Sequence, residues 1–561
     1  MEREVNQSVQ EFNDSDEARE HSHQAGKDSK GERTEDYTAR YTPRSYRRWG
    51  VASVATTALG GMAYLADFAI GASVGIAHGT VNALVAIVLA ATVIFITALP
   101  LGYYSARYNL DLDLVTRGAG FGYYGSVITA AIFASYTFIF FALEGSIMAQ
   151  GLKLGLHLPL WLGYLVSTLM IIPLIVYGMN TLTKVQLWTT PIWLFLMIAP
   201  VAYLAISDPS TVSQFFSYAG ESGKEHLNFA SVMLGAGVVL SLIAQIGEQN
   251  DVLRFMPPRT EENKRSWWLG VIMAGPGWVL LAIIKQALGV FLAVYVLARV
   301  SPAVATEPVE QFRAAFLTAL PSWLAVALAV ILVVISQVKI NVVNAYSGSL
   351  AWTNAYTRVS KRYPGRLVFL GLNLLVALTL MEANMFSFLN GILGFYANCG
   401  IAWIVTVGTD IMINKRVLKL SPEEPEFRRT MLYAVNPVGV GSFLLATGLS
   451  WAAYFGGLGQ GLQPYSAIVA FVVALVATPL LAVATGGRYY LKRTDDGIAE
   501  PRFDADGSPA TGDYVCHVCH QVFERPDMMS CPTHDEPICS LCLTTDRHRH
   551  HVVFVKRRDT R

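Results

Sequence analysis

The chain has 561 residues, of which 53% are hydrophobic and only 15% are charged, and its formal net charge is +1. Its mean hydropathy is +0.40. This composition excludes a soluble enzyme of this length and indicates a membrane protein.

Residues 1–43 form a polar N-terminal segment. Its first 40 residues are rich in charge and almost free of large apolar side chains, so they lack the apolar region of a signal peptide and cannot build a core. We expect a disordered cytoplasmic tail here.

Residues 44–490 contain twelve apolar runs. A helix needs about 20 mostly apolar residues to cross the hydrocarbon core of a bilayer. The runs lie near 50–73, 80–105, 124–151, 160–178, 188–207, 229–247, 267–298, 322–345, 366–381, 385–411, 431–454 and 464–487. They predict an all-α membrane domain with twelve transmembrane helices.

The positive charges of the loops predict the orientation. Most Lys and Arg residues between the runs fall on one side of the membrane, whereas the other side holds only Lys153, Lys224, Arg299 and Arg313. Positive loops are retained in the cytoplasm. We therefore expect both termini in the cytoplasm, as an even helix count requires, and a multi-pass protein of the plasma membrane.

Seven polar side chains fall at membrane depth, where they are costly and usually face a cavity or a partner. They are Asp67, Glu144, Glu248, Lys285, Lys339, Asn341 and Asn344. These residues are the first candidates for function.

Glycine and small residues cluster in the first and sixth runs, at 58–75 and 235–251. Such clusters mark places where a membrane helix can unwind beside a ligand. The two runs open successive sets of five, which favours an inverted repeat. The alternative is that the small residues serve only close helix packing.

Four motifs between about residues 41 and 490 resemble the purine-cytosine permease branch of the nucleobase-cation symporters. They are "RGAGFGYYGS" (117–126), "QIGEQNDVLRFMPP" (245–258), "NAYSGSLAWTN" (344–354) and "VGTDIMINKR" (407–416). The resemblance implies a LeuT-type fold of two five-helix inverted repeats with two extra helices. It also implies a central substrate site beside breaks in the first and sixth helices, and transport by alternating access.

The resemblance places an aromatic side chain and a glutamine on the third helix, where they bind the ring of the substrate. Counting from Gly122, these positions are Phe140 and Glu144. An i, i+4 pair shares one helix face. An ionised carboxylate only accepts hydrogen bonds, so Glu144 favours a ring edge rich in N–H groups or carries a proton. The alternative for Phe140 is simple packing.

The sixth and eighth helices supply the remaining candidates. The stretch "GAGVVLSLIAQ" at 235–245 of the sixth run has no aromatic residue, which argues against an aromatic sandwich around the substrate. Gln245 is expected to line the pocket, and Asp251 with Arg254 to form a gate or a structural ion pair, while Glu248 fits either set. Asn344 is expected to bond the substrate or to tie two helices.

The resemblance also identifies the position of a sodium site. Sodium-coupled members carry a Ser-Thr pair five to six residues before the asparagine that matches Asn344, and here these positions are Val338 and Lys339. Our hypothesis is that the Lys339 ammonium replaces the ion and ties the eighth helix to the first through backbone carbonyls or Asp67. Coupling is then to protons, through Lys339 or Glu144, or absent.

Two other polar features are given no role in transport. Asp410 is interpreted as a solvated charge at a helix end, and Cys399 as a small core residue. The glycines at 118, 120 and 122 lack the strand-turn-helix context of a nucleotide loop, and no catalytic triad is present. We expect neither an enzyme nor a nucleic-acid partner.

A second module follows a polar linker at 491–513 and spans 514–555. Five of the six cysteines fall between Cys516 and Cys542, with the spacing C-x2-C-x11-C-x2-H-x4-C-x2-C-x5-H-x2-H. Eight soft ligands in four close pairs predict two tetrahedral zinc sites, with a single-zinc fold as the alternative. Disulfides are excluded by the cytoplasmic location predicted above.

The spacing resembles the cross-brace B-box and RING-like modules, in which alternate pairs share an ion. This implies Cys516, Cys519, Cys539 and Cys542 at one site, and Cys531, His534, His548 and His551 at the other. His550 is an alternative to either of the last two, and His517 and His520 are interpreted as bystanders. We expect a cytoplasmic protein partner for such a module.

Together these features predict a permease that imports a nucleobase or a related small heterocycle. The rival hypothesis is a membrane sensor that binds such a ligand and signals through its zinc-binding tail. A third is an amino-acid or amine carrier of the same fold.

Overall fold

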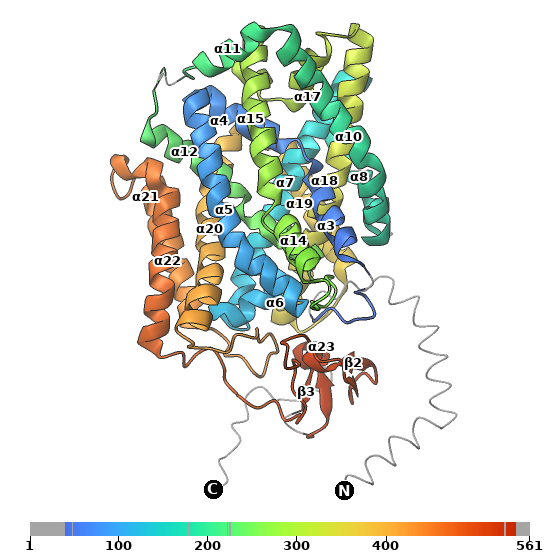
Figure 1. Ribbon diagram of the computed structural model, residues 1–561, viewed down its shortest axis with the longest axis vertical. Coiled ribbons are helices and arrows are strands. Elements are labelled where there is room, and N and C mark those ends of the chain that lie inside the picture. Colours follow the sequence, from blue (N-terminus) through green and yellow to red (C-terminus); the bar gives the residue numbers. More distant parts are fainter. Residues whose placement is uncertain are drawn as a thin grey trace, which may run out of the picture.

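The computed structural model describes residues 40–47, 49–176, 179–221, 223, 226–531 and 534–545, with only the backbone for residues 176 and 179–186. A helix covers each of the twelve apolar runs (Figure 1). The helices of the bundle are α3 (Val51–Gly60), α4 (Ala66–His78), α5 (Thr80–Tyr108), α6 (Leu112–Thr116), α7 (Ser126–Leu156), α8 (Leu160–Leu169), α9 (Ile172–Val176), α10 (Met179–Ser207), α11 (Pro209–Ser217), α12 (Phe229–Val239), α13 (Ile246–Leu253), α14 (Lys264–Ala274), α15 (Trp278–Leu297), α16 (Pro302–Ala305), α17 (Pro308–Phe316), α18 (Ser322–Ser360), α19 (Arg366–Glu382), α20 (Leu389–Thr409), α21 (Pro437–Tyr454) and α22 (Ser466–Thr485).

Eight helices in the described part of the chain are long and apolar enough to cross a membrane, and the bent pair α3 and α4 makes a ninth span. The runs at 160–178, 366–381 and 431–454 form shorter helices, of which α19 has 17 residues and α21 has 18. The chain is therefore a multi-pass membrane protein. The number of twelve crossings stays a prediction.

The first run is broken where its small residues predicted a break. Helix α3 ends at Gly60, a 3-10 turn covers Gly61–Ala63, and Tyr64 is extended before α4 begins. The two halves are bent by 50°. In the sixth run a 3-10 segment, η3 (Leu240–Gln245), separates α12 from α13. The bend in the first run frees backbone carbonyls from regular helical bonding, whereas the 3-10 segment of the sixth run lies within one continuous span, Phe229–Leu253.

Helix α4 lies directly against α15 because glycines face the contact from both sides. A Cβ on Gly71 would collide with the backbone of Gln286, and a Cβ on Gly289 would collide with the backbone of Phe68. Small residues allow this close approach of two membrane helices. The contact brings the start of α15 beside the break in the first run.

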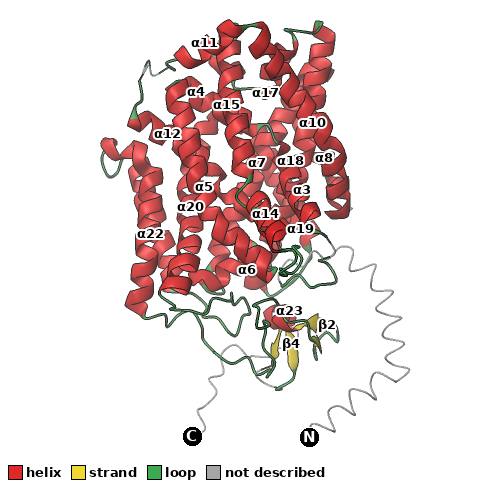
Figure 2. Ribbon diagram, in the orientation of Figure 1, coloured by secondary structure: helices red, strands yellow, loops and turns green. Residues whose placement is uncertain are grey.

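A small module lies against one end of the helix bundle, as Figure 2 shows by its strands. Strand β1 (Asp513–Val515) pairs with β2 (Val522–Glu524), and β3 (Met528–Ser530) pairs with β4 (Pro537–Cys539), both antiparallel. The short helix α23 (Ser540–Thr545) follows. We call the end of the bundle that carries this module the tail face.

Both ends of the described chain lie on the tail face. The Tyr41 hydroxyl donates to Glu524 Oε2 at 2.9 Å, and the Arg44 backbone N–H donates to Oε1 of the same carboxylate at 2.6 Å. This placement is what an even number of crossings requires.

The interpretation of Asp410 as a solvated charge is wrong. Asp410 is fully buried and accepts hydrogen bonds from Asn414 at 2.8 Å and from the Tyr490 hydroxyl. The segment that follows α21 and α22 folds back over this end of α20, which the run pattern did not reveal. Cys399 is buried in α20, as its interpretation as a core residue requires.

Candidate substrate site and metal centre

A lysine ammonium occupies the break in the first run. Lys285 Nζ donates to the Met62 carbonyl at 2.7 Å and to the Tyr64 carbonyl at 3.1 Å, and it forms an ion pair of 2.8 Å with Asp67. It also lies 3.7 Å from the centre of the Tyr64 ring. Three acceptors match the three N–H groups of an ammonium, so this buried charge is fully satisfied.

Asp67 is held from two sides. Its second oxygen accepts a hydrogen bond of 2.7 Å from Gln286, the residue next to Lys285 on α15. Both partners come from one helix, and the close packing of α4 on α15 positions them. The carboxylate is completely buried.

The hypothesis that Lys339 ties the eighth helix to Asp67 needs correction. Lys339 Nζ donates to the hydroxyls of Thr189 at 3.2 Å and Thr190 at 2.7 Å, so it joins α18 to α10. The ammonium that holds the first run is that of Lys285. The sequence placed Lys285 among the candidates but did not show which lysine faces the break.

Phe140 and Glu144 lie on the inner face of α7, both buried. Phe140 packs against Tyr136, with ring centroids 4.4 Å apart. Glu144 Oε1 accepts the Ala66 backbone N–H at 3.3 Å, at the start of α4. A carboxylate at a helix N-terminus is favoured by the N–H groups that lack helical partners. The predicted pair therefore reaches the break in the first run.

Gln245 belongs to the same buried network. Its Oε1 accepts from the Tyr136 hydroxyl at 2.6 Å, and its Nε2 donates to Glu248 at 3.1 Å. Glu248, which was left between two roles, thus joins the predicted pocket. Asn344 donates to Asn341 at 3.3 Å within α18.

Negative charge exceeds positive charge in this network. Its ionisable members are Asp67, Glu144, Glu248 and the single ammonium of Lys285, which pairs with Asp67. Glu144 Oε2 and Glu248 Oε1 are buried and have no hydrogen-bond partner within the described residues. Buried carboxylates without partners are costly, so these two suit a proton or a ligand with N–H donors.

The predicted gate residues lie on the tail face side of this network. Arg254 forms an ion pair of 3.6 Å with Asp111, donates to the Tyr346 hydroxyl at 3.1 Å and bonds the backbone carbonyl of Asp251 at 3.2 Å. All are buried. Arg254 therefore joins the start of α6, the end of α13 and α18. Its partner in the ion pair is the carboxylate of Asp111.

A cavity with a volume of about 750 Å³ lies at the opposite end of the bundle, where α17 is found in Figure 1. Ser73, Lys153, Glu307 and Asn390 are among its lining residues. Lys153 lies about 13 Å along α7 from Glu144, at 1.5 Å per residue. The cavity is therefore a vestibule on the side away from the tail, and Ser73 donates to Asn390 across it at 2.9 Å.

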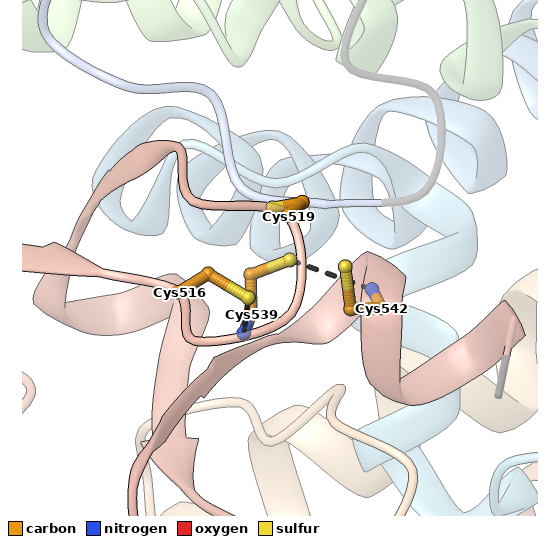
Figure 3. Close-up of side chains that lie close together, drawn as sticks. All are labelled: Cys516, Cys519, Cys539 and Cys542. Carbon is orange, nitrogen blue, oxygen red and sulfur yellow. Dashed lines mark hydrogen bonds between the residues drawn. The ribbon is translucent and has the colours of Figure 1, made fainter. Parts of the chain in front are cut away.

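Four cysteines of the module point toward one another (Figure 3). The sulfurs of Cys516, Cys519, Cys539 and Cys542 all lie within 4.8 Å of each other. Tetrahedral zinc at 2.3 Å from each sulfur sets them roughly 3.8 Å apart. The Cys539 N–H donates to Cys516 Sγ and the Cys542 N–H to Cys539 Sγ, both at 3.4 Å. The structure brings these four cysteines together, and the group could hold a metal ion.

A second group contains Cys531 and His534, as predicted, together with His517. His517 was interpreted as a bystander. Its backbone N–H donates to the Pro537 carbonyl at 3.0 Å, and this contact with β4 brings it to the group. The predicted ligands His548 and His551, with the alternative His550, lie outside the described residues.

Several residues of the site were missed by sequence reasoning. Tyr136 stands four residues before Phe140, so the i, i+4 spacing that selected Glu144 also indicates it. Gln286 and Asp111 gave no signal, since their role depends on a partner far away in the sequence.

Comparison with known proteins agrees with this architecture. The family described as permease for cytosine/purines, uracil, thiamine and allantoin matches residues 41–435. No curated protein matches the sequence.

Two solved structures of one transporter have a similar fold. Mhp1, a nucleobase-cation-symport-1 family transporter, in a closed conformation with bromovinylhydantoin bound, shares 16% identity, with a TM-score of 0.60 over 80% of this chain and 96% of its own. Its inward-facing conformation shares 17% identity, with a TM-score of 0.60 over 81% and 97%.

A sodium-coupled sialic acid symporter, solved in a substrate-bound outward-open state, is a more distant neighbour. It shares 13% identity, with a TM-score of 0.54 over 81% of this chain and 93% of its own. At these identities the likeness establishes the fold and not the substrate.

Proposed function

The chain belongs to the family of permeases for cytosine/purines, uracil, thiamine and allantoin, and from this premise we propose that it imports a nucleobase or a related small heterocycle by alternating access. It is a secondary transporter and not an enzyme. The observation that supports the substrate class is the pair of aromatic rings of Tyr136 and Phe140, tilted by 31° to each other, on the same helix as the buried carboxyl group of Glu144. An aromatic face takes a flat ring, and a carboxylate takes its N–H edge.

We assign the reading of the ring edge to Glu144, Gln245 and Asn344. Glu144 accepts from Ala66 at the break in the first run, Gln245 accepts from Tyr136, and Asn344 is buried on α18, where it donates to Asn341. Because Glu144 and Glu248 each hold an oxygen with no partner in the described residues, a ring with two N–H donors suits the site better than one with only acceptors. A purine or pyrimidine base and a hydantoin-like ring both meet this requirement.

Sodium is not required in this proposal. The ammonium of Lys285 already bonds the carbonyls of Met62 and Tyr64, which are the kind of hard oxygen ligands that a cation at the break would use. Lys339 places a second positive charge at the position where sodium-coupled relatives have hydroxyls. Two fixed ammonium groups disfavour a further cation nearby.

Coupling is proposed to protons, with Glu144 as the carrier. Lys285 balances Asp67, so ionisation of Glu144 would leave a buried charge without a counter-ion. A protonated Glu144 avoids this cost and still bonds the substrate. Orientation with both termini in the cytoplasm, in the plasma membrane, completes the proposal.

Uptake into proteoliposomes tests this function. The full-length protein is reconstituted and offered labelled nucleobases with a sodium gradient, with a proton gradient and with neither. We expect uptake that follows the proton gradient and ignores sodium. Saturable binding without uptake would instead support the sensor, and uptake of amino acids or amines alone would contradict the assigned substrate class.

Truncation of Phe140 should weaken substrate binding. Phe140→Ala removes one stacking face, worth about 1–3 kcal/mol for a base on an aromatic side chain, so we expect KM to rise about tenfold or more with kcat less affected. Phe138→Ala on the same helix is the matched control, because Phe138 is only partly buried and lies outside the network. Equal effects in the two variants would contradict stacking on Phe140.

Glu144→Gln should separate binding from coupling. The amide keeps an acceptor for the Ala66 N–H but cannot release a proton. We expect substrate exchange between equal concentrations to continue and proton-driven accumulation to be lost. A variant that still accumulates substrate along a proton gradient would show that another group carries the proton.

The four-cysteine group is proposed to hold zinc. Four thiolates are soft ligands, and a tetrahedral set favours zinc over magnesium or calcium. A closed set of four ligands is structural and leaves no position for catalysis.

A further inference from the structure

The core of the C-terminal module is completed by a loop of the permease. Met431, which precedes α21, packs in one hydrophobic cluster with residues of β3, β4 and α23. Thr430 contacts Met529 Sδ at 3.0 Å, and Arg429 donates to the carbonyls of Leu543 and Thr544, both at 3.3 Å. Residues 426–431 therefore form part of the module as well as part of the permease.

Buried ion pairs reinforce this junction. Arg428 binds Glu426 at 2.8 Å and Asp496 at 2.6 Å, and Asp496 also pairs with Arg525 at 2.9 Å. Arg502 adds a contact of 2.9 Å to Glu426. The segment predicted as a linker thus supplies Asp496 and Arg502 to the contact. Glu426, Arg428 and Asp496 each have two partners of opposite charge, which favours a fixed geometry over a loose tether.

This network predicts how the junction depends on pH. Burial alone would raise the pKa of Glu426. The positive charges of Arg428 and Arg502 outweigh burial and lower this pKa from 4.5 to about 2. Because the pKa is lower in the docked state, the ionised carboxylate of Glu426 stabilises docking. This stabilisation is complete above about pH 4.5, the ordinary pKa, and is lost as the pH falls toward about 2. Cleavage of residues 426–431 by pepsin should follow this curve, whereas Glu426→Gln should abolish the part of the dependence that comes from this carboxylate.

The module also contacts helices from both five-helix sets. The Tyr123 hydroxyl, just before α7, donates to Thr544 at 2.9 Å. Arg358, near the end of α18, donates to the Tyr123 carbonyl at 3.1 Å and pairs with Asp113 at 2.7 Å. Movement of α7 against α18 at the tail face would disturb these contacts.

A chain of buried contacts leads from the module to the predicted gate. Arg47 lies 3.5 Å from Glu524 of β2 and donates to Asn109 at 2.8 Å. Asn109 in turn donates to the carbonyls of Arg254 at 2.9 Å and Met256 at 3.0 Å. The module is therefore connected, through Arg47 and Asn109, to Arg254, the residue that bonds Asp111, Asp251 and Tyr346.

The group of His517, Cys531 and His534 has the chemistry of a second metal site. Their ligand atoms lie within 4.8 Å of one another. His517 Nδ1 is 2.9 Å from the Pro537 carbonyl, a contact that makes Nδ1 the protonated nitrogen and leaves the Nε2 lone pair for a metal. Cys531 Sγ is 3.5 Å from His534 Nδ1. One sulfur and two imidazoles suit a zinc-like divalent cation.

We propose that the C-terminal module is a metal-dependent strap across the tail face, and that His517, Cys531 and His534 hold a second metal ion in addition to the one at the four cysteines. The strap joins the start of α7, the end of α18 and the loop at 426–431. It restrains the opening of this face, so metal loading slows transport. The proposal rests on the zinc site proposed above and does not require that the cargo be a nucleobase.

Metal content tests the second site in the full-length protein. We expect two zinc ions per chain, and one after His517→Ala. His520→Ala is the matched control, since His520 lies in the same turn but outside both groups, and it should keep two ions. Two ions retained by His517→Ala, or one ion in the unaltered protein, would overturn the assignment of this site.

Hydrogen exchange tests the strap. Amides at 426–431 and 40–47 should be protected in the metal-loaded protein, and a zinc chelator should raise their exchange by about tenfold or more, as local opening does. Glu524→Ala should raise exchange at 40–47 without changing the metal content. Exchange that is the same with and without chelator would refute the strap even if the protein transports nothing.

Transport gives the functional result. Chelation on the tail side of proteoliposomes should raise the initial rate of uptake by about fivefold or more, a change typical of coupled sites. Metal return should restore the slower rate. An unchanged rate together with increased exchange would show that the strap does not restrain the gate and would overturn that part of the proposal.

Discussion

Replacing Lys285 with methionine is expected to abolish uptake and to lower the free energy of unfolding by about 3–5 kcal/mol, the usual cost of removing one partner of a buried pair. Methionine keeps most of the side-chain volume but removes three hydrogen bonds, to Met62, Tyr64 and Asp67. Asp67 would then be a buried carboxylate with Gln286 alone. Chemical unfolding in detergent measures the stability, and proteoliposome uptake measures the function.

Two further variants separate charge balance from position. Asp67→Asn combined with Lys285→Met removes the unpaired charge, so we expect it to recover most of the lost stability but not the transport. Lys339→Met is the matched control, because Lys339 bonds the hydroxyls of Thr189 and Thr190 and no carboxylate within the described residues. A larger loss of stability from Lys339→Met than from Lys285→Met would contradict the central position of Lys285.

The sequence predicts elements and candidates well where the signal is local. Run length located the helices, the small residues at 58–75 located the break at Tyr64, and the i, i+4 spacing placed Phe140 and Glu144 on one face. These features depend on residues within a few turns of each other. Hydropathy and periodicity report such neighbours directly.

Pairing across the fold is what the sequence does not contain. Lys285 and Lys339 both stand in apolar runs, and only the packing of α15 against α4 decides that Lys285 meets Asp67. The same limit explains Asp410, whose burial comes from Tyr490, 80 residues away. A charged residue at membrane depth predicts that a partner exists, but the sequence does not show which residue it is.

The metal module shows both sides of this limit. The four ligand pairs are visible in the spacing, the resemblance to cross-brace modules implied which pairs share an ion, and the structure brings these four cysteines together. His517 was interpreted as a bystander because its place beside Cys531 and His534 depends on β4, which brings Pro537 against its ring. The contact of the module with residues 426–431 has no counterpart in the spacing at all.

Removal of one ligand at the four-cysteine site is expected to unfold the module as a whole. Cys539→Ser replaces a sulfur that is 1% exposed and lies at the end of β4, between the strands and α23. Structural zinc supplies about 10–16 kcal/mol of apparent binding free energy in small zinc-dependent domains, more than so small a core can provide. We expect loss of bound zinc and of exchange protection throughout 513–545.

The matched control for this variant is Cys399→Ser. Cys399 is also buried, but it lies in α20 outside both metal-ligand groups, so zinc content should stay unchanged while any effect falls on the permease. If Cys539→Ser kept the zinc and the protection of the module, the four thiols would not form a structural site. If the variant lost both the zinc and the protection while uptake became faster, the tail face would be held only by its ion pairs. This result would support the metal-dependent restraint independently of the chelator and of the His517 variant.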